Sequence, residues 1–156
     1  MLKRWSWLSI LFIFIDQISK HLAETLLEIN HPVHILPSFN LTLTYNTGAA
    51  FSLLAEAGGW QRWFFLDLGL MVSIGLVFWM QHLKSRDRWL AAALALILAG
   101  AVGNLIDRFC IGKVVDFIDF YYDLWHFPVF NIADVAINIG GILLVADSIH
   151  SKQANA

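Results

Sequence analysis

The stretch WLAAALALILAGAVGNLI, residues 89–106, decides the fold of this chain because it contains no charged side chain. A helix that crosses a membrane needs about 20 mostly apolar residues. With the residues that follow it, this stretch fits such a helix over about residues 89–108, and comparable runs cover about residues 5–25, 60–80 and 129–149. The sequence therefore predicts a single membrane domain, residues 1–156, with four transmembrane helices.

The composition excludes an ordinary soluble domain. Hydrophobic residues make up 58% of the 156 residues and charged residues only 14%, whereas soluble proteins carry about 25% charged residues. The mean hydropathy is +0.65. The ten basic residues are scattered or lie near the ends of the apolar runs, so they form no basic face and nucleic acid is not an expected partner.

The basic residues between and beside the apolar runs predict the orientation. By the positive-inside rule, the side of the membrane that collects them is cytoplasmic. This side would hold both termini and the connection between the second and third runs, with Lys3, Arg4, Lys84, Arg86, Arg88 and Lys152. The first run begins like a signal peptide, but Asp16 and Lys20 follow it instead of a small-residue cleavage site, so we expect it to be retained.

The long segment after the first run lies on the opposite, outer side. Residues 39–45 alternate apolar with Thr or Asn side chains, which is typical of a half-exposed strand. Residues 46–48 indicate a turn, and residues 49–54 could return as a second strand. The fold class expected is therefore all-α, an integral membrane protein with a small extracytoplasmic β-hairpin or sheet at about residues 39–56. The connection at residues 109–128 is expected to be a loop.

Polar residues inside the apolar runs form stripes at helical spacing. Asp16 and Lys20 are four residues apart and share one helix face. Each stripe alone is more often a packing device than a site, because small residues let helices approach and polar residues bond across the contact. The other stripes consist of Gly100, Gly103, Asn104, Asp107 and Arg108 in the third run, and of Asn131, Asp134 and Asn138 in the fourth.

The directions of the helices bring these stripes together. The first and third helices run outward and the fourth runs inward, so the polar ends of all three fall at the outer face. Independent packing devices would not need to converge in this way. We therefore predict one polar site at the outer end of the bundle, with Asp116 supplied by the 109–128 connection and Asn46 by the hairpin.

Several kinds of chemistry are not expected at this site. The histidines, among them His21 and His126, lack a metal-ligand spacing such as H-E-x-x-H. Ser19 and Ser52 lie in no recognisable nucleophile turn. The single cysteine, Cys110, has no obvious paired histidine and cannot form an internal disulfide.

Two carboxylates remain, Asp116 and Asp134. Two neighbouring carboxyl groups do not both ionise easily, so one can serve as a general acid while the other serves as a general base toward water. This is the chemistry of an aspartic protease. The amide groups of Asn46, Asn104 and Asn131 could then hold an extended substrate.

The chain resembles the signal peptidase II family, the lipoprotein signal peptidases of bacterial membranes. The resemblance covers nearly the whole chain and depends on five motifs that occur in the same order. They are Asp16-Gln17-Ile18-Ser19-Lys20, Asn46-Thr47-Gly48-Ala49-Ala50-Phe51, Gly103-Asn104-Leu105-Ile106-Asp107-Arg108, Val114-Val115-Asp116-Phe117 and Phe130-Asn131-Ile132-Ala133-Asp134.

The resemblance implies a membrane aspartyl endopeptidase, a hydrolase that cleaves diacylglyceryl-modified prolipoproteins just before the lipid-modified cysteine. It implies a monomer in the bacterial cytoplasmic (inner) membrane, in contact with membrane lipids, without metal or organic cofactor, and a target of globomycin-type cyclic peptide antibiotics. Asp116 and Asp134 match the catalytic dyad. Positions that match the substrate-binding pocket are Asp16, Lys20, Asn46, Gly48, Asn104, Asp107, Arg108, Asn131 and Ala133.

Two further hypotheses concern moving parts. The hairpin at residues 46–54 could form a cradle over the substrate, and the 109–128 connection could form a lid. Because Asp116 would then lie on a loop, we expect it to be the more mobile of the two aspartates. The aromatic-rich residues 119–126 have no interpretation at this level.

Two other classes of function stay open on the residues alone. Membrane carboxylates near Lys or Arg also build proton relays, so a small transporter or proton-conducting protein is one alternative. The inner halves of the later spans are nearly free of charge, which disfavours a relay across the membrane. A structural membrane scaffold is the other alternative.

Overall fold

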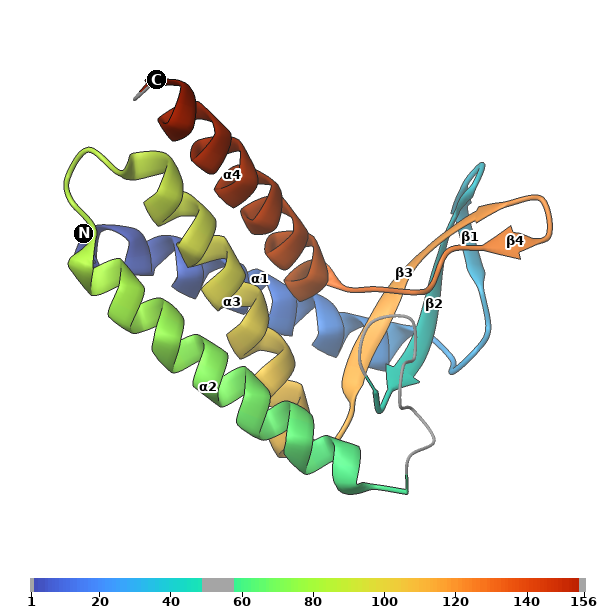
Figure 1. Cartoon of the computed structure of the whole chain (residues 1–156). Helices are drawn as coiled ribbons and strands as arrows, with labels where there is room; N and C mark the ends of the chain where they lie inside the picture. Colours follow the sequence, from blue (N-terminus) through green and yellow to red (C-terminus); the bar gives the residue numbers. More distant parts are fainter. Residues whose placement is uncertain (1, 49–57, 155–156) are drawn as a thin grey trace.

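The computed structural model describes residues 2–48 and 58–154. Figure 1 shows both chain ends and the α2–α3 turn at one end of the helix bundle, and a β-sheet at the other end. The helices are α1 (Leu2–Leu26), α2 (Trp60–His82), α3 (Arg88–Cys110) and α4 (Ile132–Ala154), and the strands are β1 (Val33–Leu36), β2 (Phe39–Asn46), β3 (Val114–Tyr122) and β4 (Trp125–His126).

Helix α3 is the centre of the bundle and packs against α1, α2 and α4. Its small side chains allow this. A side chain at Gly140 of α4 would lie 2.7 Å from the carbonyl oxygen of Ala93, and one at Gly100 of α3 would overlap the backbone of Ala133. The two backbones therefore approach as closely as small-residue contacts between membrane helices permit.

Three of the described helices are long and apolar enough to cross a membrane: Trp60–His82, Arg88–Cys110 and Ile132–His150. Large apolar side chains such as Met71 and Phe78 point outward from α2, as expected where lipid surrounds a helix. The chain is thus a mostly helical, multi-pass membrane protein with a small sheet. Helix α1 lies outside this group because its second half carries Asp16, Gln17 and Lys20.

The sheet is antiparallel with the strand order β1-β2-β3-β4. Strand β2 confirms a strand at residues 39–45, but not its expected apolar face: Asn40 and Thr42 are buried, whereas Phe39 and Leu41 are half-buried. Its described partners, however, are β1 and β3, not the predicted returning strand at residues 49–54, which lies outside the described residues together with the rest of 49–57. The 109–128 connection was expected to be a loop, but it contains β3 and β4.

The sheet is fixed to the C-terminal end of α1 by a small apolar core. Ala23 of α1 packs there with Leu43 of β2 and with Val115 and Phe117 of β3. Val114–Phe117 is buried without interruption. This packing holds β3 against the C-terminal ends of α1 and α3.

Candidate active site

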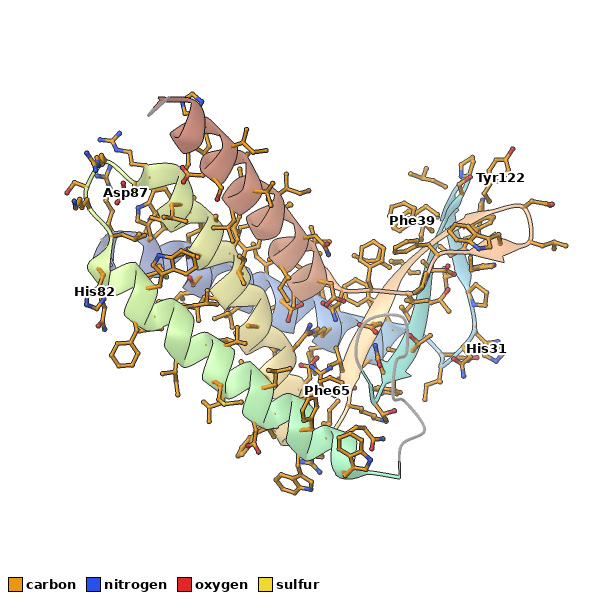
Figure 2. The ribbon with its side chains drawn as sticks, viewed as in Figure 1. His31, Phe39, Phe65, His82, Asp87 and Tyr122 are labelled. Atoms are coloured by element: carbon orange, nitrogen blue, oxygen red, sulfur yellow. The ribbon has the colours of Figure 1, made fainter. Side chains whose placement is uncertain are left out.

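A cavity of about 740 Å³ lies between the sheet and the helix ends next to it. Its polar lining includes Asn46, Asn104, Arg108, Asp116 and Asp134. Figure 2 labels one apolar lining residue, Phe65, near the start of α2. The other apolar lining residues are Leu68, Val114, Phe127, Pro128, Val129, Phe130, Val135, Ile137, Ile139 and Ile142.

Asp116 lies within β3, where its backbone is paired with Thr44 of β2. The prediction that it belongs to a loop is therefore wrong, and the reason to expect it to be the more mobile aspartate disappears. Only 2% of the residue is exposed. Burial and the charge of Asp134 raise the pKa of Asp116 to about 7, although hydrogen bonds from Asn131 and Asn46 act in the opposite direction.

Asp134 lies in the first turn of α4, where it takes part in a reciprocal cap. Its backbone N–H donates to Oδ1 of Asn131 at 2.9 Å, and the Asn131 N–H donates to Oδ2 of Asp134 at 3.3 Å. Nδ2 of Asn104 donates to the other carboxylate oxygen at 2.9 Å. These donors and the helix N-terminus stabilise negative charge on Asp134.

Two asparagines connect the two aspartates. Asn131 is fully buried, and its Nδ2 donates to Oδ1 of Asp116 at 2.7 Å. The same nitrogen lies 3.2 Å from Oδ1 of Asn104, which in turn binds Asp134. The amide groups therefore fix the two carboxylates relative to each other while leaving both on the cavity wall.

A buried ion cluster lies behind this wall. Nζ of Lys20 is 2.8 Å from Oδ2 of Asp16 and 2.7 Å from Oδ2 of Asp107. It also donates to Oδ1 of Asn104 at 3.0 Å. The remaining carboxylate oxygen of Asp16 accepts the N–H of Ala133 at 2.8 Å. The cluster therefore ties α1 and α3 to the start of α4.

Arg108 joins the end of α3 to the β2 turn. Its Nη2 donates to the carbonyl oxygen of Gly48 at 2.7 Å, and its guanidinium lies over the ring of Phe65 at 5.2 Å. The Gly48 N–H donates to Oδ1 of Asn46 at 2.9 Å. Among the described residues, the buried Nε of Arg108 has no hydrogen-bond partner.

The structure brings the predicted site residues together in two layers. Asn46, Asn104, Arg108, Asp116 and Asp134 line the cavity. A second layer supports them without lining the cavity: Asp16, Lys20, Gly48, Asp107, Asn131 and Ala133. The spacing of these residues in the sequence indicated that they lie near the site, but not which of them line the cavity.

The sequence analysis did not predict most of the apolar residues that line the cavity. The run Phe127–Phe130 forms a continuous part of the wall, and its apolar, aromatic character next to Asn131 was the available signal. Within residues 2–48 and 58–154, no group of histidine, cysteine or acidic side chains is arranged to hold a metal ion. The polar groups named above in the cavity lining are two carboxylates, amides and a guanidinium.

Comparisons with known proteins agree with this geometry. The family model for signal peptidase (SPase) II matches residues 8–150. A lipoprotein signal peptidase of Acinetobacter baumannii is 54% identical over 144 residues, which cover 92% of this chain and 82% of the relative. A lipoprotein signal peptidase of Hydrogenovibrio crunogenus is 47% identical over 156 residues, with 97% and 91% covered. A solved bacterial membrane enzyme has a TM-score of 0.89 and 31% identity, with 100% of this chain and 93% of that chain covered.

Proposed function

The chain belongs to the signal peptidase II family, and from that premise we propose that it is a membrane peptidase that removes signal peptides from lipoprotein precursors. The bond cleaved is the one just before the diacylglyceryl-modified cysteine. The observation that carries this proposal is the single cavity that combines two carboxylates with a long apolar wall. A lipid-modified peptide requires both features.

The two aspartates have different roles in this proposal. Asp116 carries the proton, because burial and the neighbouring charge raise its pKa to about 7. Asp134 is the base, because N–H donors reach both of its carboxylate oxygens. The pair thus shares one proton near neutral pH, as two close carboxylates do in aspartic proteases.

The reaction needs only these groups and water. Asp134 takes a proton from a water molecule whose oxygen attacks the scissile carbonyl carbon, while Asp116 gives its proton to the carbonyl oxygen. The resulting diol collapses when Asp116 takes a proton back from one hydroxyl group. Asp134 then protonates the departing nitrogen as the carbon–nitrogen bond breaks, and both aspartates return to their starting states.

Arg108 and the apolar wall bind the two parts of the substrate. The guanidinium of Arg108, which lines the cavity, donates to a peptide carbonyl oxygen, and Asn46 provides a further amide on the same wall. The acyl chains of the modified cysteine contact the apolar side chains of α2 and α4, including Leu68, Ile139 and Ile142. Burial of these chains adds about 0.8 kcal/mol for each CH₂ group.

We further propose that α1 is a fourth membrane span. Its charges Asp16 and Lys20 are paired with each other, which lowers the cost of their position in the membrane. With four spans, both termini are cytoplasmic and the cavity opens at the outer face of the bacterial inner membrane. The protein acts as a monomer in contact with lipid, and globomycin-type cyclic peptides compete for the cavity.

The test is cleavage of a diacylglyceryl-modified lipoprotein precursor by the purified protein in detergent. Asp116→Asn and Asp134→Asn should each lower kcat at least about a hundredfold, because each removes a proton-transfer group. Asp123→Asn is the matched control. Asp123 lies in the β3–β4 turn, away from the cavity, so this variant should keep full activity.

Three results would count against the proposal. Wild-type activity in either dyad variant would remove the assignment of the aspartates. Equal cleavage of the precursor without its diacylglyceryl group would remove the substrate class. Failure of a globomycin-type peptide to inhibit would remove the assignment of the cavity as its binding site.

A further inference from the structure

A second polar cluster occupies the face of the sheet that is turned away from the cavity. Side chains alternate along a strand, so Asp119 and Asp116 of β3 point to opposite faces, and Asp119 is absent from the cavity lining. We call this group the outer sheet cluster. It consists of His34, Asn40, Thr42, Asp119, Tyr121 and His126.

The centre of the outer sheet cluster is the carboxylate of Asp119, which is 2% exposed. Oγ1 of Thr42 donates to it at 2.7 Å, and Nδ1 of His126 lies 2.8 Å from its other oxygen. Burial opposes ionisation, but the hydrogen bonds from His126 and Thr42 outweigh it and lower the pKa of Asp119. Asp119 is therefore a charged group that depends on these partners.

His126 is the partner that faces water. Its side chain is 49% exposed, and its ring stacks on Tyr121 at 5.4 Å between ring centres. His34 of β1 reaches the other groups of the cluster, with Nδ1 lying 3.3 Å from the hydroxyl of Tyr121. Strand β4 itself comprises Trp125 and His126. Its backbone pairs with Tyr121 and Tyr122 of β3, and the Asp119–His126 bond adds a side-chain attachment to this short pairing.

The chain continues directly from His126 into the cavity wall. The next four residues, Phe127–Phe130, all line the cavity. Their backbone is bonded to β3 near both ends, where Phe127 N–H donates to the Phe120 carbonyl oxygen at 2.8 Å and Phe130 N–H donates to that of Ile118 at 3.1 Å. A shift of His126 therefore displaces the start of this wall.

We propose that the Asp119–His126 pair is a latch that holds the 127–130 wall of the cavity in its substrate-binding position. His126 is then a positioning residue for the reaction of the preceding section, on which this inference rests. A histidine can gain a proton between about pH 5 and 8. Protonation of His126 converts the hydrogen bond into a charge-assisted one, which is stronger, so the latch is tighter in acid.

Steady-state kinetics with the lipid-modified precursor separate binding from chemistry. At pH 6, His126→Ala should raise KM about tenfold, because it removes a hydrogen bond to a charged group, and should leave kcat within about twofold of wild type. Asp119→Asn should raise KM by a similar factor. The double variant should be no worse than either single one, because both changes remove the same interaction.

The conservative variant His126→Asn supplies the sharpest control. Its amide nitrogen can replace Nδ1 as a donor to Asp119 but cannot gain a proton. KM should return close to the wild-type value at pH 8, and the fall in KM that wild type shows toward pH 6 should be absent. His34→Gln, in the same cluster but remote from the 127–130 segment, should change KM by less than about twofold.

Hydrogen–deuterium exchange of the backbone amides at residues 127–130 tests the pair without any turnover. His126→Ala and Asp119→Asn should each speed exchange of the Phe127 N–H, because its hydrogen bond to the Phe120 carbonyl oxygen opens more often once the pair is lost. If wild type cleaves no precursor, the proposed function fails while this exchange still tests the pair. The latch is overturned if exchange at Phe127 does not change, or if His126→Ala lowers kcat and leaves KM unchanged.

Discussion

The helix bundle and the sheet each contribute one aspartate to the cavity, and the two regions support it by different chemistry. Asp134 of the bundle accepts a hydrogen bond from Asn104, and Asn104 in turn accepts one from the buried, charged Lys20. Asp116 belongs to β3, which also carries the buried Asp119 and its half-exposed partner His126. One side is closed from water and the other is open to it.

Because of this difference, the support in the bundle should not change with pH, whereas the support in the sheet should. In the bundle, Lys20 is shared between two carboxylates and all three groups are buried, so a change in outside pH has little access to them. In the sheet, the exposed ring of His126 can exchange protons with water. The bundle therefore sets the geometry of the site, and the sheet adjusts it.

The largest expected effect comes from breaking the fixed support. Lys20→Met leaves Asp16 and Asp107 buried without their counter-charge, which costs about 3–5 kcal/mol of unfolding free energy. The measurement is denaturant or thermal unfolding in detergent. Lys113→Met is the control, because Lys113 lies over the ring of Tyr45 and forms no ion pair with any residue that the structure describes. A Lys20→Met protein as stable as wild type would show that the bundle is not held by this cluster.

A smaller loss of unfolding free energy should follow from adding a methyl group next to the same buried ion cluster. A methyl group at Gly103 would lie 2.6 Å from Oδ2 of Asp16 and 3.2 Å from Cβ of Ala133, so Gly103→Ala should cost about 1–3 kcal/mol. Gly75→Ala in α2 meets nothing within 4 Å. It should instead stabilise the protein by up to about 1 kcal/mol, and equal effects of the two changes on the unfolding midpoint would contradict the model of close packing.

A third expected effect concerns pH on the sheet side. The pKa of Asp116 lies at about 7 in the folded protein against an ordinary value of 3.8, so the folded state keeps a proton that the unfolded chain loses. The contribution of this group to stability therefore falls as pH rises from about 4 to 7. Above about pH 7 the acid form is lost, and kcat/KM should fall about tenfold for each further pH unit.

Unfolding curves at several pH values check this without activity. Asp116→Asn should be less sensitive to pH than wild type over the same interval, because asparagine has no proton to lose. An unchanged pH dependence of stability in this variant would assign the effect to another group. A flat activity profile up to pH 9 would argue against Asp116 as the acid.

The helices could be predicted closely because their signal is local. The predicted runs 60–80 and 89–108 correspond to Trp60–His82 and Arg88–Cys110. The last helix begins at Ile132 instead of residue 129, because Asn131 caps it and Phe130 pairs with Ile118. Only tertiary contacts determine that boundary.

Strand β3 could not be predicted for the opposite reason. Helices α2 and α3 lie between β3 and its partner β2 in the sequence, so no turn next to β3 indicates the pairing. The buried run Val114–Phe117 has no alternating pattern, because both of its faces are covered. The sequence also did not indicate which polar side chains line the cavity. Asp107 and Asp134 belong to similar polar stripes, yet of these two only Asp134 lines it.

The order of the elements along the chain has a consequence for biosynthesis. Asp116 and Asp134 are near the end of the sequence, and β3 can pair with β2 only after α2 and α3 have been made and have found their places. Contacts between distant segments form late and slowly. A nascent chain therefore has neither carboxylate in place, and the pair proposed to carry out hydrolysis comes together only after β3 and α4 have been made.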